Sequence, residues 1–433
     1  AYNVVIKKAG SRGAEDHAPV MLQGHMDMVC EKRAGVEHDF EKDGLDLIIR
    51  DGRLTANGTT LGGDNGVAVA LMLMGLDDDE IEHPPVECVF TTEEEVGLNG
   101  AKALDKSVLK ARTMINMDSE DEGVATVSCA GGLRVQFTKE IQRTTVQGSL
   151  LTLKVEGLLG GHSGQDIDKE RQNADLLMAR MIQRLLKETK GQLVSFNGGT
   201  KDNAIPRECE ASLIYESDEE AAKAEELACE LAETYAEELT PAEPDFSCEI
   251  SCETNRTAEA IPQDAAKEFI CAMRLAPNGI QKRNIKMDGF VVVSLNLGVV
   301  RTEEDRIVMI FSPRSSVASL QEDTKERLNT LAETFGFTVS HSSEYPGWSF
   351  KEDSPVREIC KESYKELFGE DLKIEAIHAG LECGLFSDAI KGLDAIAIGP
   401  TIANCHTPDE YLTLDSFERF YEFLKDILSR LAK

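Results

Sequence analysis

The chain has 433 residues, 41% of them hydrophobic, and a formal net charge of −32. It is too long for one ordinary hydrophobic core, so we expect two domains, and the apolar fraction is enough to fill both. The strong negative charge argues against nucleic acid and an anionic membrane surface as partners.

Cysteine usage and hydropathy indicate where the protein works. The eleven cysteines include no close Cys-x-x-Cys pair, a pattern typical of reduced thiols. No run approaches the roughly 20 apolar residues of a membrane-spanning helix, and no signal peptide is evident at the start. We therefore expect a cytoplasmic protein. The chain begins at Ala1 and enters a predicted strand at once, so we expect part of the native N-terminus to be absent.

Two apolar runs in the N-terminal part are typical of buried strands, and each leads into a polar motif. The run 19–23 is followed by His25 and Asp27, and the run 86–92 is followed by Glu93-Glu94-Glu95. In open α/β sheets, ligands bind at the carboxyl ends of parallel strands. We therefore expect these polar side chains to lie at one edge of a sheet.

Three further residues are candidates for the same edge. Asp64 lies in a glycine-rich segment before a predicted helix at 66–76, and it could also cap that helix. Asp118 directly follows a predicted strand at 113–117, and His406 comes soon after another apolar run near the C-terminus. The pattern predicts that residues far apart in the sequence converge on one site.

The order of predicted elements changes along the chain. At both ends, strands and helices alternate in α/β order, whereas the middle combines alternating strands with long acidic helices such as 218–239. If His406 joins the N-terminal carboxylates, the middle must be an insertion. We therefore expect a discontinuous catalytic domain, residues 1–131 and 348–433, and an inserted α+β lid or substrate-binding domain, residues 132–347.

The donor types indicate a pair of divalent metal ions. Imidazole nitrogen and carboxylate oxygen suit zinc, and they also admit manganese or cobalt. Two ions about 3.5–4 Å apart can share a bridging carboxylate. We assign His25, Asp64 and Asp118 to one ion, and Asp64, Glu95 and His406 to the other, with Asp64 as the bridge.

The remaining carboxylates near these ligands receive different roles. Neighbouring residues at a strand end point in different directions, so Glu94 can approach the bound water while Glu95 ligates. Glu94 is therefore the predicted general base. Asp27 is predicted to orient His25 or the bridging Asp64.

These motifs also have ordinary interpretations. An isolated run of three glutamates is usually a solvated surface, and only its placement after a strand favours ligation. His17, His38, His83 and His341 lie in polar or turn-like surroundings and are expected at the surface. His162 lies between glycines that let the backbone approach a ligand closely, so from the residues alone it can be functional or structural.

Together these segments resemble the aminoacyl-histidine dipeptidases. This is the carnosinase-like, Xaa-His dipeptidase branch of the co-catalytic zinc metallopeptidases, which also include carboxypeptidase G, peptidase T and aminoacylase. The resemblance runs from about Asn3 to the end of the chain. Its most specific segments are 22–29, 58–66, 92–97, 116–120, 160–166, 203–208, 378–384 and 398–401.

The resemblance implies a fold, an activity and further site residues. The expected fold is α/β, a mixed-sheet zinc-exopeptidase-like catalytic domain interrupted by an α+β lid, and the expected reaction is hydrolysis of Xaa-His or other dipeptides by a hydroxide bridging two metal ions. In this family a lid histidine, here His162, stabilises the carbonyl oxyanion, and in dimeric members it reaches the partner's site; we expect a homodimer. The substrate's free carboxylate would be held by Arg314 and the backbone around Gly380, with Asn203 as a further contact.

Alternatives stay open at this point. Arg314 could form an ordinary salt bridge within the lid. The same metals and carboxylate grip would also serve an amidohydrolase or deacylase acting on N-acylated amino acids. A catalytically inactive homologue that binds metal or peptide is a third alternative.

Overall fold

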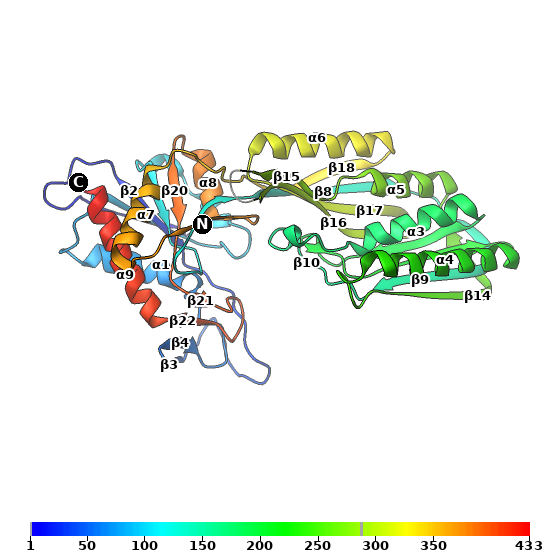
Figure 1. The fold of residues 1–433 in the computed structure, drawn as a ribbon, viewed down its shortest axis with the longest axis horizontal. Coiled ribbons are helices and arrows are strands. Elements are labelled where there is room, and N and C mark those ends of the chain that lie inside the picture. Colours follow the sequence, from blue (N-terminus) through cyan, green and yellow to red (C-terminus); the bar gives the residue numbers. More distant parts are fainter. Residues whose placement is uncertain (1, 286–288) are drawn as a thin grey trace. The chain divides into compact units, whose positions relative to one another are not determined.

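Two units, each with its own sheet, make up the computed structural model, which describes residues 2–285 and 289–433 (Figure 1). Unit 1 comprises the chain up to Cys129 together with Pro346–Lys433, and unit 2 comprises Ala130–Tyr345. The chain therefore leaves unit 1 after Cys129 and re-enters it at Pro346. Within the described residues, no helix is both long enough and apolar enough to cross a membrane.

Unit 1 is built on a seven-stranded mixed sheet with the order β1-β5-β2-β6-β20-β7-β19. The central strands β5, β2, β6 and β20 are parallel, and β1 pairs antiparallel with β5. Every residue of β2 and β5 is buried, as expected of strands covered on both faces. The strands are β1 (Val4–Lys8), β2 (Val20–His25), β5 (Val86–Thr91), β6 (Thr113–Asn116), β7 (Val124–Cys129), β19 (Lys373–Ile377) and β20 (Asp394–Ala397).

Helices and a small second sheet complete unit 1. The helices are α1 (Gly63–Asp77), α2 (Asn99–Ala103), the 3-10 turn η1 (Lys106–Val108), α7 (Pro355–Phe368), α8 (Glu382–Ala389) and α9 (Leu414–Leu431). The small sheet has the order β21-β22-β4-β3, with β3 (Leu47–Arg50), β4 (Arg53–Ala56), β21 (Ile402–Ala403) and β22 (Tyr411–Thr413). It joins the segment before α1 to the segment before α9, and thereby links the two halves of the unit.

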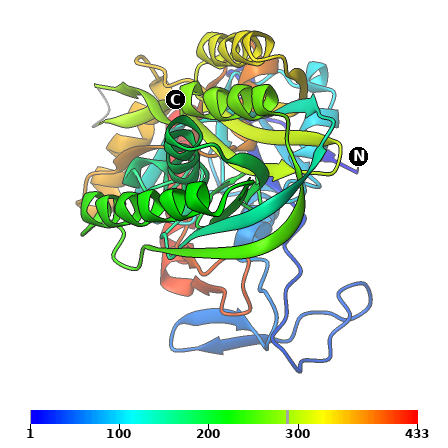
Figure 2. The same cartoon turned by 90° about the vertical axis from the view of Figure 1, so that its right-hand side faces the viewer.

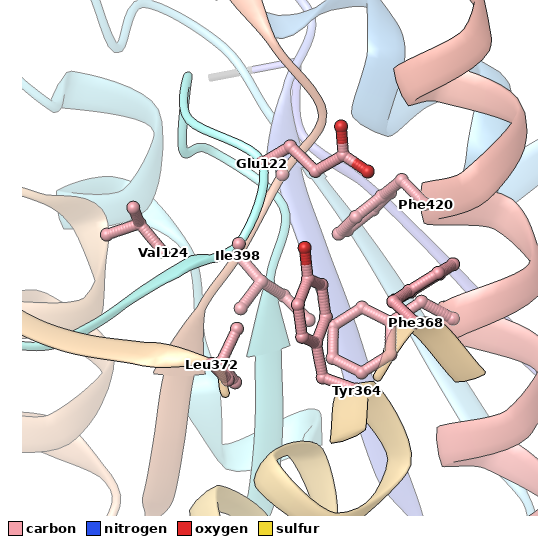
Figure 3. Close-up of a pocket in the computed structure, with 10 residues that line it drawn as sticks. Glu122, Val124, Tyr364, Phe368, Leu372, Ile398 and Phe420 are labelled. Atoms are coloured by element: carbon pink, nitrogen blue, oxygen red, sulfur yellow. The ribbon is translucent and has the colours of Figure 1, made fainter. Parts of the chain in front are cut away.

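Aromatic rings pack α7 against α9. The ring centroids of Tyr364 and Phe423 lie 5.2 Å apart, and those of Tyr364 and Phe368 lie 4.8 Å apart. A small cavity of about 10 Å³ lies among these rings, with the carboxylate of Glu122 beside Phe420 (Figure 3). None of the predicted site residues lines this cavity, which belongs to the packing of the unit.

Unit 2 is an antiparallel sheet with helices packed on one face. The strand order is β14-β9-β13-β11-β16-β17-β8-β18, and β15 pairs with β16. Alternate strand residues, such as Leu151, Leu153 and Val155, are buried under the helices, as the two-residue period of a strand requires. Figure 2 shows the strands and helices of this unit after a 90° turn about the vertical axis. The strands are β8 (Gly131–Glu140), β9 (Thr144–Glu156), β11 (Gln192–Gly198), β13 (Cys209–Tyr215), β14 (Ser247–Ala260), β15 (Gly279–Asn284), β16 (Phe290–Thr302), β17 (Arg306–Ser315) and β18 (Thr338–Tyr345), and the helices are α3 (Ala174–Glu188), α4 (Asp218–Leu239), α5 (Gln263–Leu275) and α6 (Ala318–Thr334).

One sequence expectation about the surface is wrong. The side chain of His83 is buried, with 3% of its surface exposed, and its Nδ1 lies 2.7 Å from the carbonyl oxygen of Pro84. The reason is a long-range contact, because the backbone N–H of Ser11 donates to the His83 carbonyl and draws this loop onto the unit. The polar neighbours of His83 in the sequence gave no sign of that pairing.

Candidate metal centre

The five predicted ligands converge within unit 1. His25 ends β2, Asp118 follows β6, Glu95 follows β5, and His406 follows β21. One donor atom each from His25, Asp64 and Asp118 lies within 4.8 Å of the others, and the same holds for Asp64, Glu95 and His406. The structure thus brings together both predicted ligand sets, with Asp64 common to the two.

Asp64 presents one oxygen to each histidine. Its Oδ1 lies 3.1 Å from Nε2 of His25, and its Oδ2 lies 3.0 Å from Nε2 of His406. The other carboxylates complete the two groups, since Asp118 lies 3.4 Å from Nε2 of His25 and Glu95 lies 3.1 Å from Nε2 of His406. This is the arrangement expected of a carboxylate that bridges two ions.

Asp64 is carried by the start of a helix and not by the end of a strand. It lies in the first turn of α1, preceded by Gly62 at φ 69°, and its own φ and ψ are not helical. Gly62 therefore adopts the left-handed conformation that glycine tolerates best. This turn, and not the end of a strand in the central sheet, aims the Asp64 carboxylate between the two histidines.

Hydrogen bonding fixes which nitrogen of His25 faces the site. Its Nδ1 lies 3.0 Å from the backbone carbonyl oxygen of Asp27, which can only accept a hydrogen bond. Nδ1 therefore carries the proton in the neutral ring, and Nε2 is left as the donor to a metal. Burial opposes a charge on His25, but the carboxylates of Asp118, Asp27 and Asp64 outweigh this effect and raise the pKa of the imidazole.

Asp27 also holds the turn after β5. Its Oδ1 accepts a hydrogen bond from the backbone N–H of Glu94, and its Oδ2 accepts one from the backbone N–H of Glu95, both at 3.1 Å. Asp27 thus binds the backbone of both Glu94, the predicted base, and Glu95, a predicted ligand. Asp27 contacts the His25 ring mainly through its backbone carbonyl oxygen, because its side-chain Oδ1 lies farther from Nδ1, at 3.5 Å.

Glu94 lies in a partly buried position beside the ligands. One donor atom each of Glu94, Glu95 and His25 lies within 4.8 Å of the others. Burial, followed by the charge of Asp118, raises the pKa of Glu94 to about 8 in the metal-free protein. The structure thus places the Glu94 carboxyl beside two of the predicted ligands, His25 and Glu95.

Two polar side chains that the sequence did not single out support the ligands. The amide of Asn65 donates to Oδ1 of Asp118 and to the carbonyl oxygen of Met117. The carboxylate of Glu410 accepts hydrogen bonds from the turn that carries Asp64. The segment around Glu410 follows the predicted ligand His406, and that proximity was the one signal available.

A network of buried polar side chains joins Glu382 to strands β2, β5 and β6, which lead to the predicted ligands. Glu382, with 0% exposure, accepts hydrogen bonds from Gln23 at 2.5 Å and Thr91 at 2.6 Å. Gln23 accepts from Asn116, whose side-chain oxygen accepts from the backbone N–H of Asp118. Burial raises the pKa of Glu382 to about 7. Glu382 falls in the segment that carries the sequence resemblance, but its contacts are visible only in the fold.

The donor set fits a pair of divalent ions. Two imidazoles and three carboxylates supply nitrogen and oxygen donors, the types that suit zinc, manganese and cobalt. The backbone and side-chain hydrogen bonds described above orient His25 and Asp118, as is usual for metal ligands. Without an ion, the two histidines are the groups that can balance the negative charge of these carboxylates. Asp64 and Glu95 accordingly raise the pKa of His406 to about 10.

The predicted lid histidine lies in unit 2. Nδ1 of His162 accepts hydrogen bonds from the backbone N–H groups of Gly164 at 3.2 Å and Gln165 at 3.0 Å. Burial and the nearby Arg314 lower the pKa of His162, which favours a neutral ring. A neutral ring whose Nδ1 accepts must carry its proton on Nε2. His162 is therefore a hydrogen-bond donor and not a base.

Arg314 in β17 is an incompletely paired buried cation. It is 6% exposed, its Nη1 donates to the Tyr345 hydroxyl at 3.1 Å, and its Nε finds no acceptor among the described residues. Asn203 is exposed in the same unit, and its carbonyl oxygen accepts from the N–H of Ser163. Gly380 lies in unit 1, in the loop before α8.

Comparisons with known proteins place this site in a family. The sequence matches the model of peptidase family M20/M25/M40 over residues 21–430. It is 35% identical to the cytosol non-specific dipeptidase of Escherichia coli K12, over 99% of this chain and 88% of that protein. It superimposes on the crystal structure of aminoacylhistidine dipeptidase from Vibrio alginolyticus with a TM-score of 0.93 and 36% identity, covering 99% of this chain and 87% of that one. An aminopeptidase PepT from Bacillus cereus shares the fold, with a TM-score of 0.54 and 16% identity over 100% of this chain and 85% of that one.

The chain belongs to peptidase family M20/M25/M40. Peptidases of this family depend on a dinuclear metal centre, so the chain is a metal-dependent hydrolase of peptide bonds. The predicted resemblance to the aminoacyl-histidine dipeptidases and the predicted fold class are confirmed. The predicted enzyme class is confirmed as well, and the roles of individual residues are developed as proposals below.

Proposed function

We propose that the chain is a dinuclear metallodipeptidase that hydrolyses dipeptides of the Xaa-His type, with a specificity that extends to other dipeptides. The observation that carries the proposal is the placement of Asp64, with one oxygen 3.1 Å from Nε2 of His25 and the other 3.0 Å from Nε2 of His406. Both full-length relatives compared above bear dipeptidase names. The proposed metal is zinc, with manganese or cobalt as substitutes.

The catalytic roles are assigned to unit 1. When bound, two divalent ions supply Lewis acidity and make water acidic enough to serve as a nucleophile near neutral pH. We assign His25, Asp64, Asp118, Glu95 and His406 to the ions. Glu94 accepts the proton of the attacking water and delivers it to the leaving amine, and Asp27 holds Glu94 in place through its backbone N–H.

Substrate recognition is assigned to unit 2 together with one loop of unit 1. His162, as a neutral donor, would hydrogen-bond the developing oxyanion of the scissile carbonyl. The Arg314 guanidinium fits the free carboxylate of the substrate, because its Nε is buried with no acceptor among the described residues. The backbone around Gly380 and the side chain of Asn203 are assigned as further contacts.

The domain roles and the surroundings follow from these assignments. Residues 1–131 and 348–433 would form the catalytic domain, and residues 132–347 would form the lid. We propose that the protein is a cytoplasmic homodimer whose substrate is a small peptide, and that it binds neither nucleic acid nor a membrane. The net charge of −32 supports the exclusion of nucleic acid and membrane surfaces. The cytosolic name of the Escherichia coli relative supports the location.

A substrate panel tests the proposed activity. The protein, stripped of metal and reconstituted separately with zinc, manganese and cobalt, is assayed on Xaa-His dipeptides, other dipeptides and N-acetyl amino acids. The proposal predicts release of free amino acids from dipeptides. Turnover of N-acetyl amino acids alone would favour a deacylase, and no turnover with any of the metals would favour an inactive binding protein.

A further inference from the structure

Glu410 joins two turns that each carry a metal ligand. The residue precedes β22, and only 2% of its surface is exposed. Its Oε2 accepts hydrogen bonds from the backbone N–H groups of Leu61 at 2.8 Å and Gly62 at 3.0 Å, and its Oε1 accepts one from Asp64 at 3.2 Å. Glu410 is thus bound to the turn of Asp64 through three hydrogen bonds.

These N–H groups lie at the start of α1. Leu61 precedes the helix, Gly62 is its N-cap residue and Asp64 lies in its first turn. The N–H groups of the N-cap residue and the first turn have no partner within a helix, and Gly62 has no side chain to supply one. Glu410 replaces the missing cap from a position 346 residues away from Asp64. Negative charge at a helix N-terminus is also favourable. The carboxylate therefore stabilises the conformation in which Asp64 faces both histidines.

Through its own backbone, Glu410 is also linked to the segment that carries His406. The backbone N–H of Glu410 donates to the carbonyl oxygen of Thr407 at 3.1 Å, and the turn that this bond closes directly follows His406. The distance of 3.0 Å between Nε2 of His406 and Oδ2 of Asp64 therefore depends on a turn that Glu410 ties to the Asp64 backbone. Asp27 plays a similar part for another ligand turn, because its carboxylate accepts hydrogen bonds from the backbone N–H groups of Glu94 and Glu95.

Glu410 also brings a second carboxylate next to the turn of Asp64, because its Oε1 accepts from the Asp64 backbone N–H at 3.2 Å. Negative charge at this end of α1 is compatible with a purely structural cap. It would also favour divalent cations held by the neighbouring Asp64.

We propose that Glu410 is a positioning residue that sets the separation of Asp64 and His406 and thereby the affinity for the ion assigned to Asp64, Glu95 and His406. The inference rests on the metal centre of the proposed function. It goes beyond that proposal because it assigns the geometry of one ion position to a residue that touches neither ion.

The matched control for Glu410 is Glu87. Glu87 is a buried glutamate of unit 1, with 3% exposure, and it also accepts backbone hydrogen bonds, from Lys110 at 2.9 Å and Ala111 at 2.9 Å. No predicted ligand lies in the Lys110 turn. Glu410→Gln and Glu87→Gln therefore make the same chemical change at a buried acceptor of backbone hydrogen bonds, and only the first lies beside the metal ligands. Glu87 differs in one respect, because its Oε1 also pairs with Nζ of Lys7 at 2.8 Å.

The test is an equilibrium zinc titration of the metal-free proteins, followed by thermal unfolding in the presence of a chelator. We expect wild type and Glu87→Gln to bind two ions alike. For Glu410→Gln we expect the affinity for one ion to fall by about tenfold or more, the usual size of effect for a residue that orients ligands. The affinity for the other ion should fall less, because only Asp64 is common to both ions. Unfolding in chelator should show a loss of stability in both variants, so a weakened ion that is confined to Glu410→Gln reports positioning and not folding.

Unchanged affinity for both ions in Glu410→Gln would overturn the inference. If that variant does not fold, Glu410→Asp decides, because it keeps the charge and shortens the reach; it should weaken the same ion, and wild-type affinity would again overturn the inference. Failure of the proposed function gives a different result, since wild type itself would then bind fewer than two ions or bind two without dipeptide turnover. Fewer than two ions in wild type would overturn this inference as well, whereas binding without turnover would leave the titration decisive.

Discussion

The Asp27 carboxylate accepts a hydrogen bond from the backbone N–H of Glu94 at 3.1 Å, and its second oxygen accepts one from the next residue, Glu95, at the same distance. The Asp27 carbonyl meanwhile lies 3.0 Å from Nδ1 of His25. One residue therefore fixes the ring orientation of a ligand and the turn that carries both the proposed base and a second ligand. Its removal should affect catalysis more than a single lost contact would.

Replacing Asp27 by asparagine tests this relationship. Asparagine keeps one acceptor oxygen, but its NH₂ group faces an N–H, so the turn of Glu94 and Glu95 should shift. We expect kcat to fall by about 10- to 100-fold, as is usual for residues that orient metal ligands. Asp105→Asn is the control, because Asp105 accepts a backbone bond from Ser107 at 3.0 Å in an exposed turn. Equal activity of the two variants would contradict the role of Asp27.

Glu94→Gln tests the assignment of the base. The amide cannot accept the proton of the attacking water, and we expect kcat to fall by at least about 100-fold, within the range of general acid–base catalysis. Elemental analysis should still find two ions per chain, since Glu94 is not an assigned ligand. Retained turnover would refute the assignment, and a lost ion would show that Glu94 ligates.

Arg314→Lys tests recognition of the substrate carboxylate. Lysine keeps the charge but loses the planar fork that binds a carboxylate through two hydrogen bonds. We expect KM for a dipeptide to rise by about tenfold or more, with a smaller change for the same dipeptide with an amidated C-terminus. Parallel KM changes for both substrates would show that Arg314 is structural.

Asp175 predicts a pH dependence of stability that is independent of the metal site. It is the second residue of α3, fully buried beside the Cys209 thiol, and burial raises its pKa from 3.8 to about 8. The folded state therefore binds an extra proton between these values, and stability falls as pH rises through that window. Gly198 leaves room for the carboxyl, because a Cβ there would lie 1.6 Å from Oδ1.

The variant that removes this proton linkage is Asp175→Asn. Its stability relative to wild type should increase between pH 5 and pH 8, by about 1.4 kcal/mol per pH unit at most. Denaturant midpoints of metal-free protein at several pH values measure the difference. Asp264→Asn is the control, since Asp264 is the exposed second residue of α5. A difference between Asp175→Asn and wild type that does not change with pH would contradict the prediction.

The sequence indicated which candidate ligands would converge, but it did not indicate most of the residues that orient them. His25 ends a buried strand, and Glu95 and Asp118 follow buried strands. The rule that parallel strands present ligands at their carboxyl ends brings such residues together without knowledge of the packing. Glu410 and Glu382 act through contacts that span hundreds of residues, and no local pattern reports them. His83 was misjudged for the same reason, because a distant backbone contact buries it.

The central claim is that Asp64 bridges two ions, one shared with His25 and one shared with His406. The most direct test is anomalous diffraction from crystals of the zinc-loaded protein, measured above and below the zinc edge. We predict two anomalous peaks about 3.5–4 Å apart, each within bonding distance of a different oxygen of Asp64. A single peak, or two peaks of which only one contacts Asp64, would contradict the account.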